Sequence, residues 1–376
     1  RPDPKIQTAK VLWDPASQAS PALANSLAEQ KIQKTKKMKS AVLTAPGKIE
    51  IQDKEPLTPI PHEVVISVET TGICGTDLAL FSGDYLVKLP AVCGHEFVGT
   101  VKSVGKGVDK CWVGRRVTAE INNTCIAYKR AQPCLACSRG MPGHCLERTV
   151  TGIINHSGAF SEEVKVAAGT LHKIPEALDP FTAVLTEPLA AALQTYEMTP
   201  VQGDETVVVL GSGRLGILIV FVSMIKGLKV IAISRSENKR QRALEFGAKE
   251  IVDPDHGEEL VKEKTGGLGA DIVIDATGSQ NGLQQAQQLV RPRGVISVKT
   301  TCGEAMPVGG EFDTTKFVVD EVRLQGSRCG PFAPALDLLT RHQDKLKKLI
   351  TSTRPLDETQ QALESAWTED KVILKI

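Results

Sequence analysis

The stretch that decides the fold is VVVLGSGRLGIL, residues 207–218. An apolar run suited to a buried strand leads into Gly211, Gly213 and Gly216, and a helical segment follows from about Arg214 to Lys226. The G-x-G-x-x-G spacing permits a tight turn, close approach of the backbone to a pyrophosphate, and close packing of helix on strand. A bare glycine triplet could be an ordinary turn. The strand–turn–helix context predicts a dinucleotide site at the helix N-terminus, with Arg214 and Leu215 beside the glycines.

The end of the next apolar strand indicates which dinucleotide is bound. Proteins that select NAD usually carry Asp or Glu there, which bonds the ribose 2′-hydroxyl. This sequence reads KVIAISRS, so that Ser234 and Arg235 stand at the strand end. No carboxylate there repels a 2′-phosphate, and Arg235 can pair with one, unless it is only a solvated surface residue. We therefore predict NADPH over NADH, and Thr277, in the segment DATG, is a further predicted cofactor-binding residue.

Two patterns divide the chain near residue 186. Before it, short alternating runs with Gly and Pro breaks predict many short strands in a barrel-like β domain. After it, Val- and Ile-rich strands alternate with helical segments, which predicts parallel β-α-β units with strands buried on both faces. Beyond Gly330 we expect a helix over about 332–343, a second helix over 357–367 and a final strand, KVILKI.

Four residues are candidate ligands of a metal ion. Cys74 lies in GICGTD, His95 and Glu96 lie in GHEFVG, and Glu187 lies in TEPLAAAL where the two patterns meet. Taken singly, these are more often a buried thiol, a core histidine and the charge at a helix N-terminus. A thiolate, an imidazole and a carboxylate together suit Zn²⁺.

Several motifs occur in one order: GICGTDLALFSGDY, LPAVCGHEFVGTVKSVG, GRRV, GAFSEEV, TEPLAAAL and VVVLGSGRLG. Over about residues 38–376 the chain resembles the zinc-dependent medium-chain alcohol and polyol dehydrogenases. RTVTGI, VLTEPLAAAL and GSRCGPFAPAL are most similar to a threonine-dehydrogenase-like group. The resemblance implies an α/β fold, with a GroES-like β-barrel-type catalytic domain plus a Rossmann domain, a doubly wound parallel sheet. We place the catalytic domain at 38–186 and 330–376, the Rossmann domain at 187–329, and a poorly ordered extension at 1–37.

The resemblance also implies a reaction. Hydride would pass between NADP(H) and an alcohol/carbonyl pair, with a polyol, sugar or hydroxy-amino-acid-type substrate. A catalytic zinc held by Cys74, His95 and either Glu96 or Glu187 would polarise the substrate oxygen. The alternatives are a zinc-independent enoyl or quinone reductase of the same superfamily and a non-catalytic binding protein on this fold.

Two residues next to the first metal ligand take their roles from the same resemblance. Thr76 stands at the position of the family's hydroxyl proton relay. Asp77 would fix the orientation of a ligating imidazole from outside the ligand set.

A second cysteine cluster predicts a structural zinc. Cys134, Cys137 and Cys145 have the spacing C-x2-C-x7-C. Family members with a structural zinc carry another Cys three residues earlier, where this chain has Ala131. Cys125, in INNTC, would supply the first ligand if IAYKRA is a six-residue insertion, since loop-closure cost rises slowly with length. A metal-free loop or a three-cysteine remnant are the alternatives.

The composition limits the partners. Lys and Arg total 45 and Asp and Glu total 44, a net charge of +1, which argues against nucleic-acid or membrane-surface binding. The longest nearly unbroken apolar stretch, residues 215–225, is too short to span a bilayer, which requires about 20 residues. We expect a soluble homodimer or homotetramer that acts on a small molecule. Zinc thiolates favour a reducing compartment, the cytoplasm or an organelle lumen such as that of a plastid.

The remaining features carry weaker expectations. The chain begins at Arg1, so we expect it to be processed or a fragment, and its first 37 residues end in the basic run KIQKTKK. Among the cysteines outside the metal candidates, we expect Cys93, Cys111 and Cys302 to be buried thiols, and Cys329 to lie near the cleft.

Overall fold

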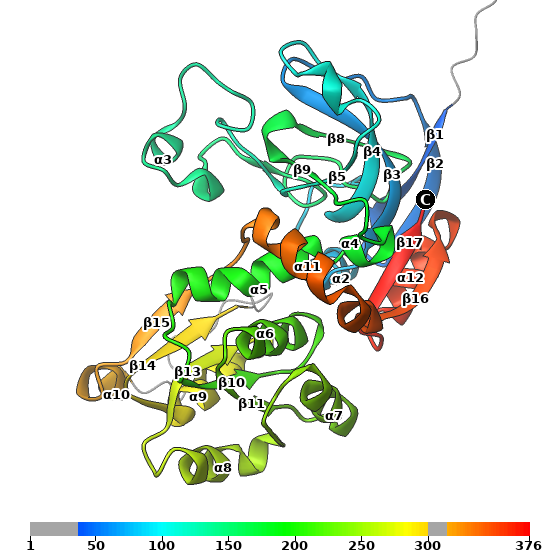
Figure 1. The fold of residues 1–376 in the computed structure, drawn as a ribbon. Coiled ribbons are helices and arrows are strands. Elements are labelled where there is room, and N and C mark those ends of the chain that lie inside the picture. The colour runs from blue at the N-terminus through cyan, green and yellow to red at the C-terminus, as the bar shows by residue number, and fades with distance from the viewer. Residues whose placement is uncertain (1–36, 300–313) are drawn as a thin grey trace, which may run out of the picture. The chain divides into compact units, whose positions relative to one another are not determined.

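The computed structural model describes residues 37–299 and 314–376 of the chain (Figure 1). The proposed N-terminal extension, apart from Lys37, lies outside the described residues, and so does Cys302. The described part contains a six-stranded sheet, a seven-stranded sheet and two small two-stranded sheets.

The six-stranded sheet is parallel throughout and carries the glycine triplet. Its strand order is β12-β11-β10-β13-β14-β15, so the order reverses at β10, the strand that leads into Gly211. Its strands are β10 (Thr206–Leu210), β11 (Lys229–Ile233), β12 (Glu250–Val252), β13 (Ala270–Asp275), β14 (Val290–Val298) and β15 (Arg323–Gly326). The doubly wound parallel sheet expected from the sequence is confirmed.

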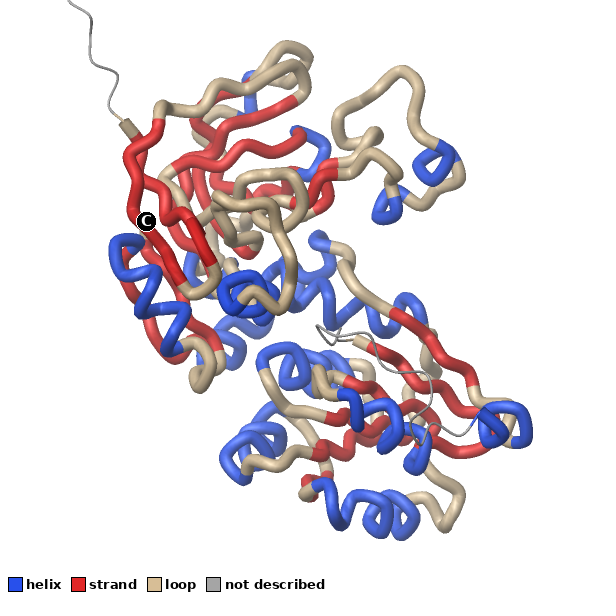
Figure 2. The backbone as a smooth tube through the Cα atoms, turned by 180° about the vertical axis from the view of Figure 1, so that it is seen from behind, coloured by secondary structure: helices blue, strands red, loops and turns tan. Residues whose placement is uncertain are grey.

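Helices cover both faces of this sheet, as Figure 2 shows from behind. Successive side chains of a strand point to opposite faces, and β10 illustrates the consequence. Val207 and Val209 belong to an apolar cluster with α5 and α6, whereas Val208 belongs to another that includes side chains of α8 and α9. The helices of this region are α5 (Thr186–Met198), α6 (Arg214–Ile225), α7 (Glu237–Phe246), α8 (Gly257–Lys264), α9 (Gln280–Leu289), α10 (Thr314–Val319) and α11 (Phe332–Leu346).

The seven-stranded sheet joins both ends of the described chain. Its order is β16-β17-β3-β4-β5-β9, and β8 pairs with β3. Its strands are β3 (Glu63–Gly72), β4 (Glu96–Val104), β5 (Arg116–Ala119), β8 (Glu163–Ala167), β9 (Leu171–Lys173), β16 (Ile350–Pro355) and β17 (Lys371–Lys375). The last strand therefore pairs with β3, some 300 residues earlier, rather than with the parallel sheet.

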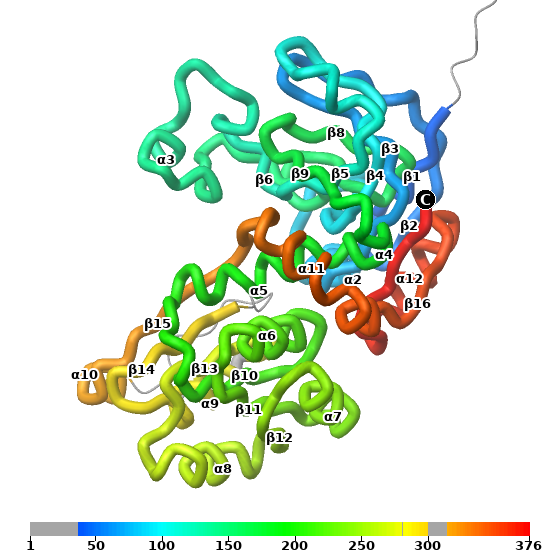
Figure 3. The backbone as a smooth tube through the Cα atoms, in the orientation of Figure 1, coloured from blue at the N-terminus to red at the C-terminus, as the bar shows by residue number. Residues whose placement is uncertain are grey.

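Shorter elements complete this half. The small sheets are β1 (Met38–Ala45) with β2 (Lys48–Lys54), and β6 (Asn122–Asn123) with β7 (Thr149–Val150). Its helices are α2 (Gly75–Ser82), α3 (Leu135–Ser138), α4 (Pro180–Ala183) and α12 (Thr359–Ser365), and its one-turn 3₁₀ helices are Lys110–Trp112, Pro142–His144, Ala168–Thr170, Lys347–Leu349 and Leu356–Glu358. A further one-turn helix, Pro254–His256, precedes α8 in the half with the parallel sheet. The segment that carries α3 loops out beyond β5 and β6 (Figure 3).

Two sequence expectations need correction. The helix expected over about 332–343 continues to Leu346 after non-helical backbone at His342, because the buried Leu346 packs into the core beyond the kink. Cys111 is exposed and not a buried thiol, because it lies in a one-turn helix whose residues are not buried, whereas Cys93 is buried as expected. None of the helices that the structure describes has the length and apolar character needed to cross a bilayer.

Candidate functional site

A buried aspartate joins the two segments that carry the first metal candidates. Cys74 is the N-cap residue of α2, and its N–H donates to Asp77 Oδ2 at 2.8 Å. The other oxygen of Asp77 accepts from Gly94 N–H at 3.0 Å. Because Gly94 directly precedes His95, one carboxylate holds the start of α2 against the start of β4.

Cys74, His95 and Glu96 come together as one potential ligand group. A ligand atom of each lies within 4.8 Å of those of the other two. His95 and Glu96 are 3% and 1% exposed, and His95 Nδ1 and Glu96 Oε1 are buried without a hydrogen-bond partner. Buried polar atoms are rarely left unpaired, and a thiol, an imidazole and a carboxylate are the donors that zinc accepts. The three residues therefore fit a zinc ion.

A hydroxyl group and a carboxylate lie beside this group. Thr76 Oγ1 lies 3.9 Å from Cys74 Sγ, and Asp77 Oδ1 lies 3.5 Å from His95 Nδ1. Burial alone would lower the pKa of His95, but the negative charges of Asp77 and Cys74 raise it well above its usual range. The site thus favours positive charge where the imidazole stands.

Glu187 is buried in the first turn of α5 and stands outside that ligand group. Burial raises the pKa of its carboxyl; the negative charge of Glu96 adds to the shift, and the positive charges of His95, Lys371 and Lys299 oppose it. Glu187 therefore belongs to the same electrostatic neighbourhood, while Glu96 is the carboxylate grouped with Cys74 and His95.

Lys371 is a residue of the site that the sequence reasoning missed. Its Nζ lies 2.6 Å from Glu96 Oε2 and donates to Ile73 O at 3.1 Å, and Lys371 is 4% exposed. A lysine at the start of the apolar run KVILKI carries no local signal of this contact, which spans 275 positions. The pair leaves only Oε1 of Glu96 free for a metal ion.

The glycine triplet has the backbone geometry that the sequence predicts. Gly211 has φ +87°, and a Cβ on Gly216 would lie 1.8 Å from Gly211 O, so the helix can approach the turn only without a side chain. A Cβ on Gly213 would meet nothing within 4 Å. The open space at Gly213, at the N-terminus of α6, is where a phosphate can approach.

Two polar side chains at this turn are buried without partners. Ser212 is 2% exposed and its Oγ has no hydrogen-bond partner, and neither has Arg214 Nε. Arg214 Nη2 donates to Glu369 O at 3.1 Å, and Leu215 packs against the adjacent core. Unpaired donors beside a helix N-terminus suit an anionic group such as a pyrophosphate.

Of the two residues at the end of β11, Ser234 is buried and Arg235 is exposed. Ser234 is 8% exposed and its N–H donates to Val252 O, whereas Arg235 is exposed. Arg240 of α7 donates from Nη1 to Ser234 O at 2.7 Å and to Arg235 O at 3.0 Å. Arg240 thus shapes the turn that presents Arg235.

Thr277 lies against the glycine turn from the neighbouring strand. A Cβ on Gly211 would come within 3.1 Å of Thr277 Cα. Asp275, at the end of β13, accepts from the Thr277 hydroxyl at 2.7 Å and from its N–H at 3.0 Å. The fold therefore brings Thr277 beside Gly211.

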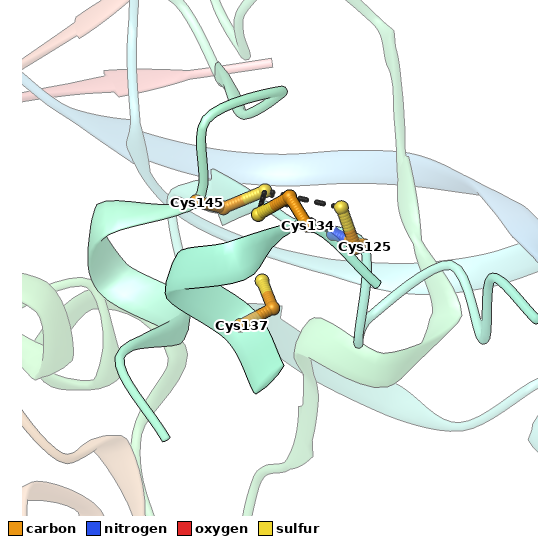
Figure 4. A group of neighbouring side chains, drawn as sticks. All are labelled: Cys125, Cys134, Cys137 and Cys145. Carbon is orange, nitrogen blue, oxygen red and sulfur yellow. Dashed lines mark hydrogen bonds between the residues drawn. The ribbon is translucent and has the colours of Figure 1, made fainter. Parts of the chain in front are cut away.

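Cys125, Cys134, Cys137 and Cys145 form a separate group in the protruding segment, with four Sγ atoms within 4.8 Å of one another (Figure 4). Cys145 Sγ lies 3.4 Å from that of Cys125 and 3.7 Å from that of Cys134. Sulfur atoms on one tetrahedral zinc ion lie about 3.8 Å apart, given Zn–S bonds of about 2.3 Å. The four residues therefore fit a zinc ion, and the structure brings Cys125 into the group although position 131 is Ala.

Backbone amides stabilise negative charge in this group. Hydrogen bonds from the backbone N–H groups of Cys137 and Leu146 lower the pKa of Cys134 to about 6. Leu146 N lies 3.3 Å from Cys134 Sγ. In the segment between Cys125 and Cys134, the Tyr128 hydroxyl donates to Glu63 Oε1 at 3.1 Å, which ties this segment to the start of β3.

Comparison with known proteins identifies the class. Residues 60–176 match the family model "Alcohol dehydrogenase GroES-like domain", and residues 215–341 match the model "Zinc-binding dehydrogenase". The chain is 31% identical over 334 residues to a sorbitol dehydrogenase of Halalkalibacterium halodurans, covering 86% of this chain and 95% of the relative. Other curated relatives are L-threonine 3-dehydrogenases. The chain belongs to the zinc-dependent medium-chain alcohol and polyol dehydrogenase family.

Solved structures agree on the fold. A zinc-binding dehydrogenase from Sinorhizobium meliloti, described as bound to NADP, is 29% identical with a TM-score of 0.79, covering 90% of this chain and 99% of that one. An alcohol dehydrogenase from E. coli CFT073, described as complexed with NADH, is 30% identical with a TM-score of 0.82, covering 91% and 100%. The relatives thus include proteins seen with each nicotinamide cofactor.

Proposed function

We propose that this zinc-dependent dehydrogenase moves hydride between NADP(H) and a small polyol, sugar or hydroxy-amino-acid-type substrate. The carrying observation is the buried group of Cys74, His95 and Glu96, with unpaired atoms on two of its members. Relatives that act on sorbitol, on threonine and on 2-dehydro-3-deoxy-L-galactonate support the substrate class. Each of these relatives is named a dehydrogenase, which is consistent with oxidation of a hydroxyl group.

The residues of the metal group have separate tasks in this proposal. Cys74, His95 and Glu96 hold the catalytic zinc, which when bound lowers the pKa of a substrate hydroxyl. Asp77 positions His95 through its bond to the neighbouring Gly94 N–H and through the charge that it places 3.5 Å from Nδ1. Thr76, next to Cys74, carries the hydroxyl proton away from the substrate. Glu187 acts from outside the ligand set, which is supported by its place outside the group around Cys74.

The cofactor site has two halves. Gly211, Gly213 and Gly216 with the N-terminus of α6 hold the pyrophosphate, and Arg214 and Ser212 supply donors to it. Thr277 lines the same turn. Arg235, at the end of β11, pairs with a 2′-phosphate, which makes NADPH the preferred cofactor.

A second zinc on Cys125, Cys134, Cys137 and Cys145 is structural in this proposal. All four ligand positions are filled by thiolates, which leaves no open position for a substrate. The chain assembles as a homodimer or homotetramer; in support, β15 ends the order of the parallel sheet and Leu324 on it is 51% exposed. Light scattering on the purified protein tests the oligomeric state.

Metal analysis tests the catalytic centre. We expect two zinc ions per chain in the wild type and one in Cys74→Ala, with loss of activity. Glu96→Gln should lose the catalytic zinc, and Glu187→Gln should keep it. Full zinc content and full activity in both Cys74→Ala and Glu96→Gln would refute the assignment.

Turnover measurements test the reaction and the cofactor. Polyols, sugars, hydroxy-amino acids and the matching carbonyl compounds are assayed with NADP(H) and NAD(H), with and without a chelator. We expect chelator-sensitive turnover and a higher kcat/KM with NADP(H), and we expect Arg235→Ala to lose most of that preference. A preference for NAD(H) in the wild type would overturn the cofactor assignment.

A further inference from the structure

Lys299 is a buried lysine at the carboxyl end of the parallel sheet, and the proposed function gives it no task. It directly follows β14, and it is only 9% exposed. Its Nζ donates to Ala191 O at 2.7 Å, Ser327 Oγ at 3.0 Å and Arg328 O at 3.2 Å. An ammonium group has three N–H donors, so these three contacts fix its position fully.

The three hydrogen-bond partners of Lys299 bring no negative charge to it. All three acceptors are neutral oxygens, and among residues 37–299 and 314–376 no carboxylate forms an ion pair with Nζ. Burial lowers the pKa of Lys299 to about 8, against the opposing effect of Glu187 and Cys329. The side chain therefore carries its positive charge at pH 7, in surroundings that screen it weakly.

The topology places this charge on one half of the dinucleotide site. The sheet order reverses at β10, where the glycine turn lies, and the two halves of such a sheet take the two halves of a dinucleotide. The end of β11, with Arg235, serves the adenosine ribose in the proposed function. The ends of β13 and β14, and with them Lys299, then serve the nicotinamide half.

A second contact points the same way. The acceptor Ala191 O belongs to α5, one turn after Glu187 on the same helix. Lys299 N–H in turn donates to Asp275 O at 3.0 Å, which ties the residue to the end of β13, next to the segment of Thr277. The Lys299 charge is thus fixed on elements that lead both to the metal group and to the glycine turn.

We propose that Lys299 makes the protein bind the reduced nicotinamide cofactor more tightly than the oxidised one. The proposal rests on the proposed function. The oxidised ring carries a positive charge; when hydride, one proton with two electrons, arrives from the alcohol carbon, the ring becomes neutral. A fixed cation therefore opposes binding of the oxidised form and has little effect on the reduced form.

The size of the effect follows from the charges. At an effective dielectric constant of about 20, two unit charges about 10 Å apart repel enough to change a dissociation constant roughly tenfold. The same discrimination aids hydride acceptance from an alcohol, because the cofactor becomes more favourably bound as it is reduced. Lys299 is thus a residue that sets selectivity for the redox state, without touching the reacting atoms.

Binding measurements without turnover test the proposal. Dissociation constants for NADP⁺ and NADPH, and for NAD⁺ and NADH, are measured by calorimetry on the zinc-loaded wild type and on Lys299→Met, Lys299→Gln and Lys299→Arg. Lys229→Met is the matched control, since it removes the same charge from an exposed residue at the start of β11, at the opposite end of the sheet. Circular dichroism and thermal melting report whether each variant folds.

The ratio of the oxidised to the reduced dissociation constant decides the outcome. We expect it to exceed one in the wild type, to fall about tenfold in Lys299→Met and Lys299→Gln, and to persist in Lys299→Arg and Lys229→Met. A wild-type ratio of one or below overturns the proposal whether or not the variants fold. Equal changes in both constants would mean a purely structural lysine and also overturn it. If neither dinucleotide binds the wild type, the proposed function itself fails.

Discussion

In zinc-depleted protein, replacing Lys371 by Met should strongly destabilise the fold, because the substitution leaves the Glu96 carboxylate buried without any cation. The two side chains are 4% and 1% exposed and lie 2.6 Å apart. Removing one partner of such a pair costs about 3–5 kcal/mol. The lost bond to Ile73 O adds about 1 kcal/mol, while the similar volume of Met keeps the cavity small.

The cost is limited by protonation, which gives the prediction a pH dependence. Neutralising a carboxyl with an ordinary pKa of about 4.3 at pH 7 costs about 3.7 kcal/mol, so with the lost bond to Ile73 O the total loss should be about 5 kcal/mol. In Lys371→Met the buried Glu96 carboxyl has no cation beside it, so burial favours its protonated form over the carboxylate. The protonated form is therefore stable at low pH, and the penalty grows as pH rises, by about 1.4 kcal/mol per unit.

Urea unfolding, followed by tryptophan fluorescence and circular dichroism, measures the effect at pH 7 and pH 5.5 with metal content determined alongside. The difference from wild type should shrink by about 2 kcal/mol at the lower pH. Lys262→Met is the matched control: its pair with Glu258 is 2.6 Å long but half exposed, so its loss should cost less than about 0.5 kcal/mol. In addition, the double variant Glu96→Gln, Lys371→Met should recover a large part of the loss. A cost no greater than that of Lys262→Met, or one that does not change with pH, would refute the reasoning.

Three further predictions concern the glycine turn and the cysteine group. Gly213→Ala should fold normally yet lose dinucleotide affinity, because its Cβ enters open space at the phosphate site. Gly216→Ala should instead be destabilised, because its Cβ would contact Gly211 O. Calorimetry measures the binding and thermal melting the stability, and normal dinucleotide binding by Gly213→Ala would contradict the site. Cys125→Ser should lose one zinc ion per chain and melt at a lower temperature. Cys111 is exposed and lies outside the group, so Cys111→Ser should keep both ions. Equal zinc content in the two variants would exclude Cys125 as a ligand. In chelator-treated protein the Cys134 thiolate, whose pKa is lowered to about 6, should form as pH rises through about 6. The thiolate's contribution to stability is complete above the unfolded pKa of about 8.5 and is lost as pH falls through about 6. Ultraviolet absorbance measures thiolate formation, and a thiolate signal that first appears near pH 8 would contradict the lowered pKa.

Local pattern predicted much of the fold. The apolar runs around Val207–Leu210 and Lys229–Ile233 are too continuous for strands with a solvent face, and the six-stranded parallel sheet buries them on both faces. The turn at Gly211 was also predictable, since its left-handed backbone and the 1.8 Å approach at Gly216 require glycine. Local pattern was misleading at Cys111, because burial depends on what packs against a short turn, and the sequence does not show that.

The sequence predicted which residue types form the candidate sites, but only partly how these residues are arranged in space. Each of the two metal groups comes from motifs close together in the sequence, and the structure brings the members of each group together. The groups are the four cysteines and the set of Cys74, His95 and Glu96. Their roles stay predictions. The choice between Glu96 and Glu187 was left open, because the two belong to different elements, and only their packing places one within the ligand group.

By itself, the sequence determined the parallel sheet, the glycine turn and the types of donor available to metal ions, because these depend on residues close together in the chain. Tertiary structure alone decided which charges are buried together. Lys371 reaches Glu96 across 275 positions, and Lys299 reaches the backbone of α5 across 108. Both lysines follow or begin apolar strands, where sequence pattern predicts burial of the chain but not the partner of a charge. That partner is set by packing between distant elements, and the free energy of a buried charge depends on it.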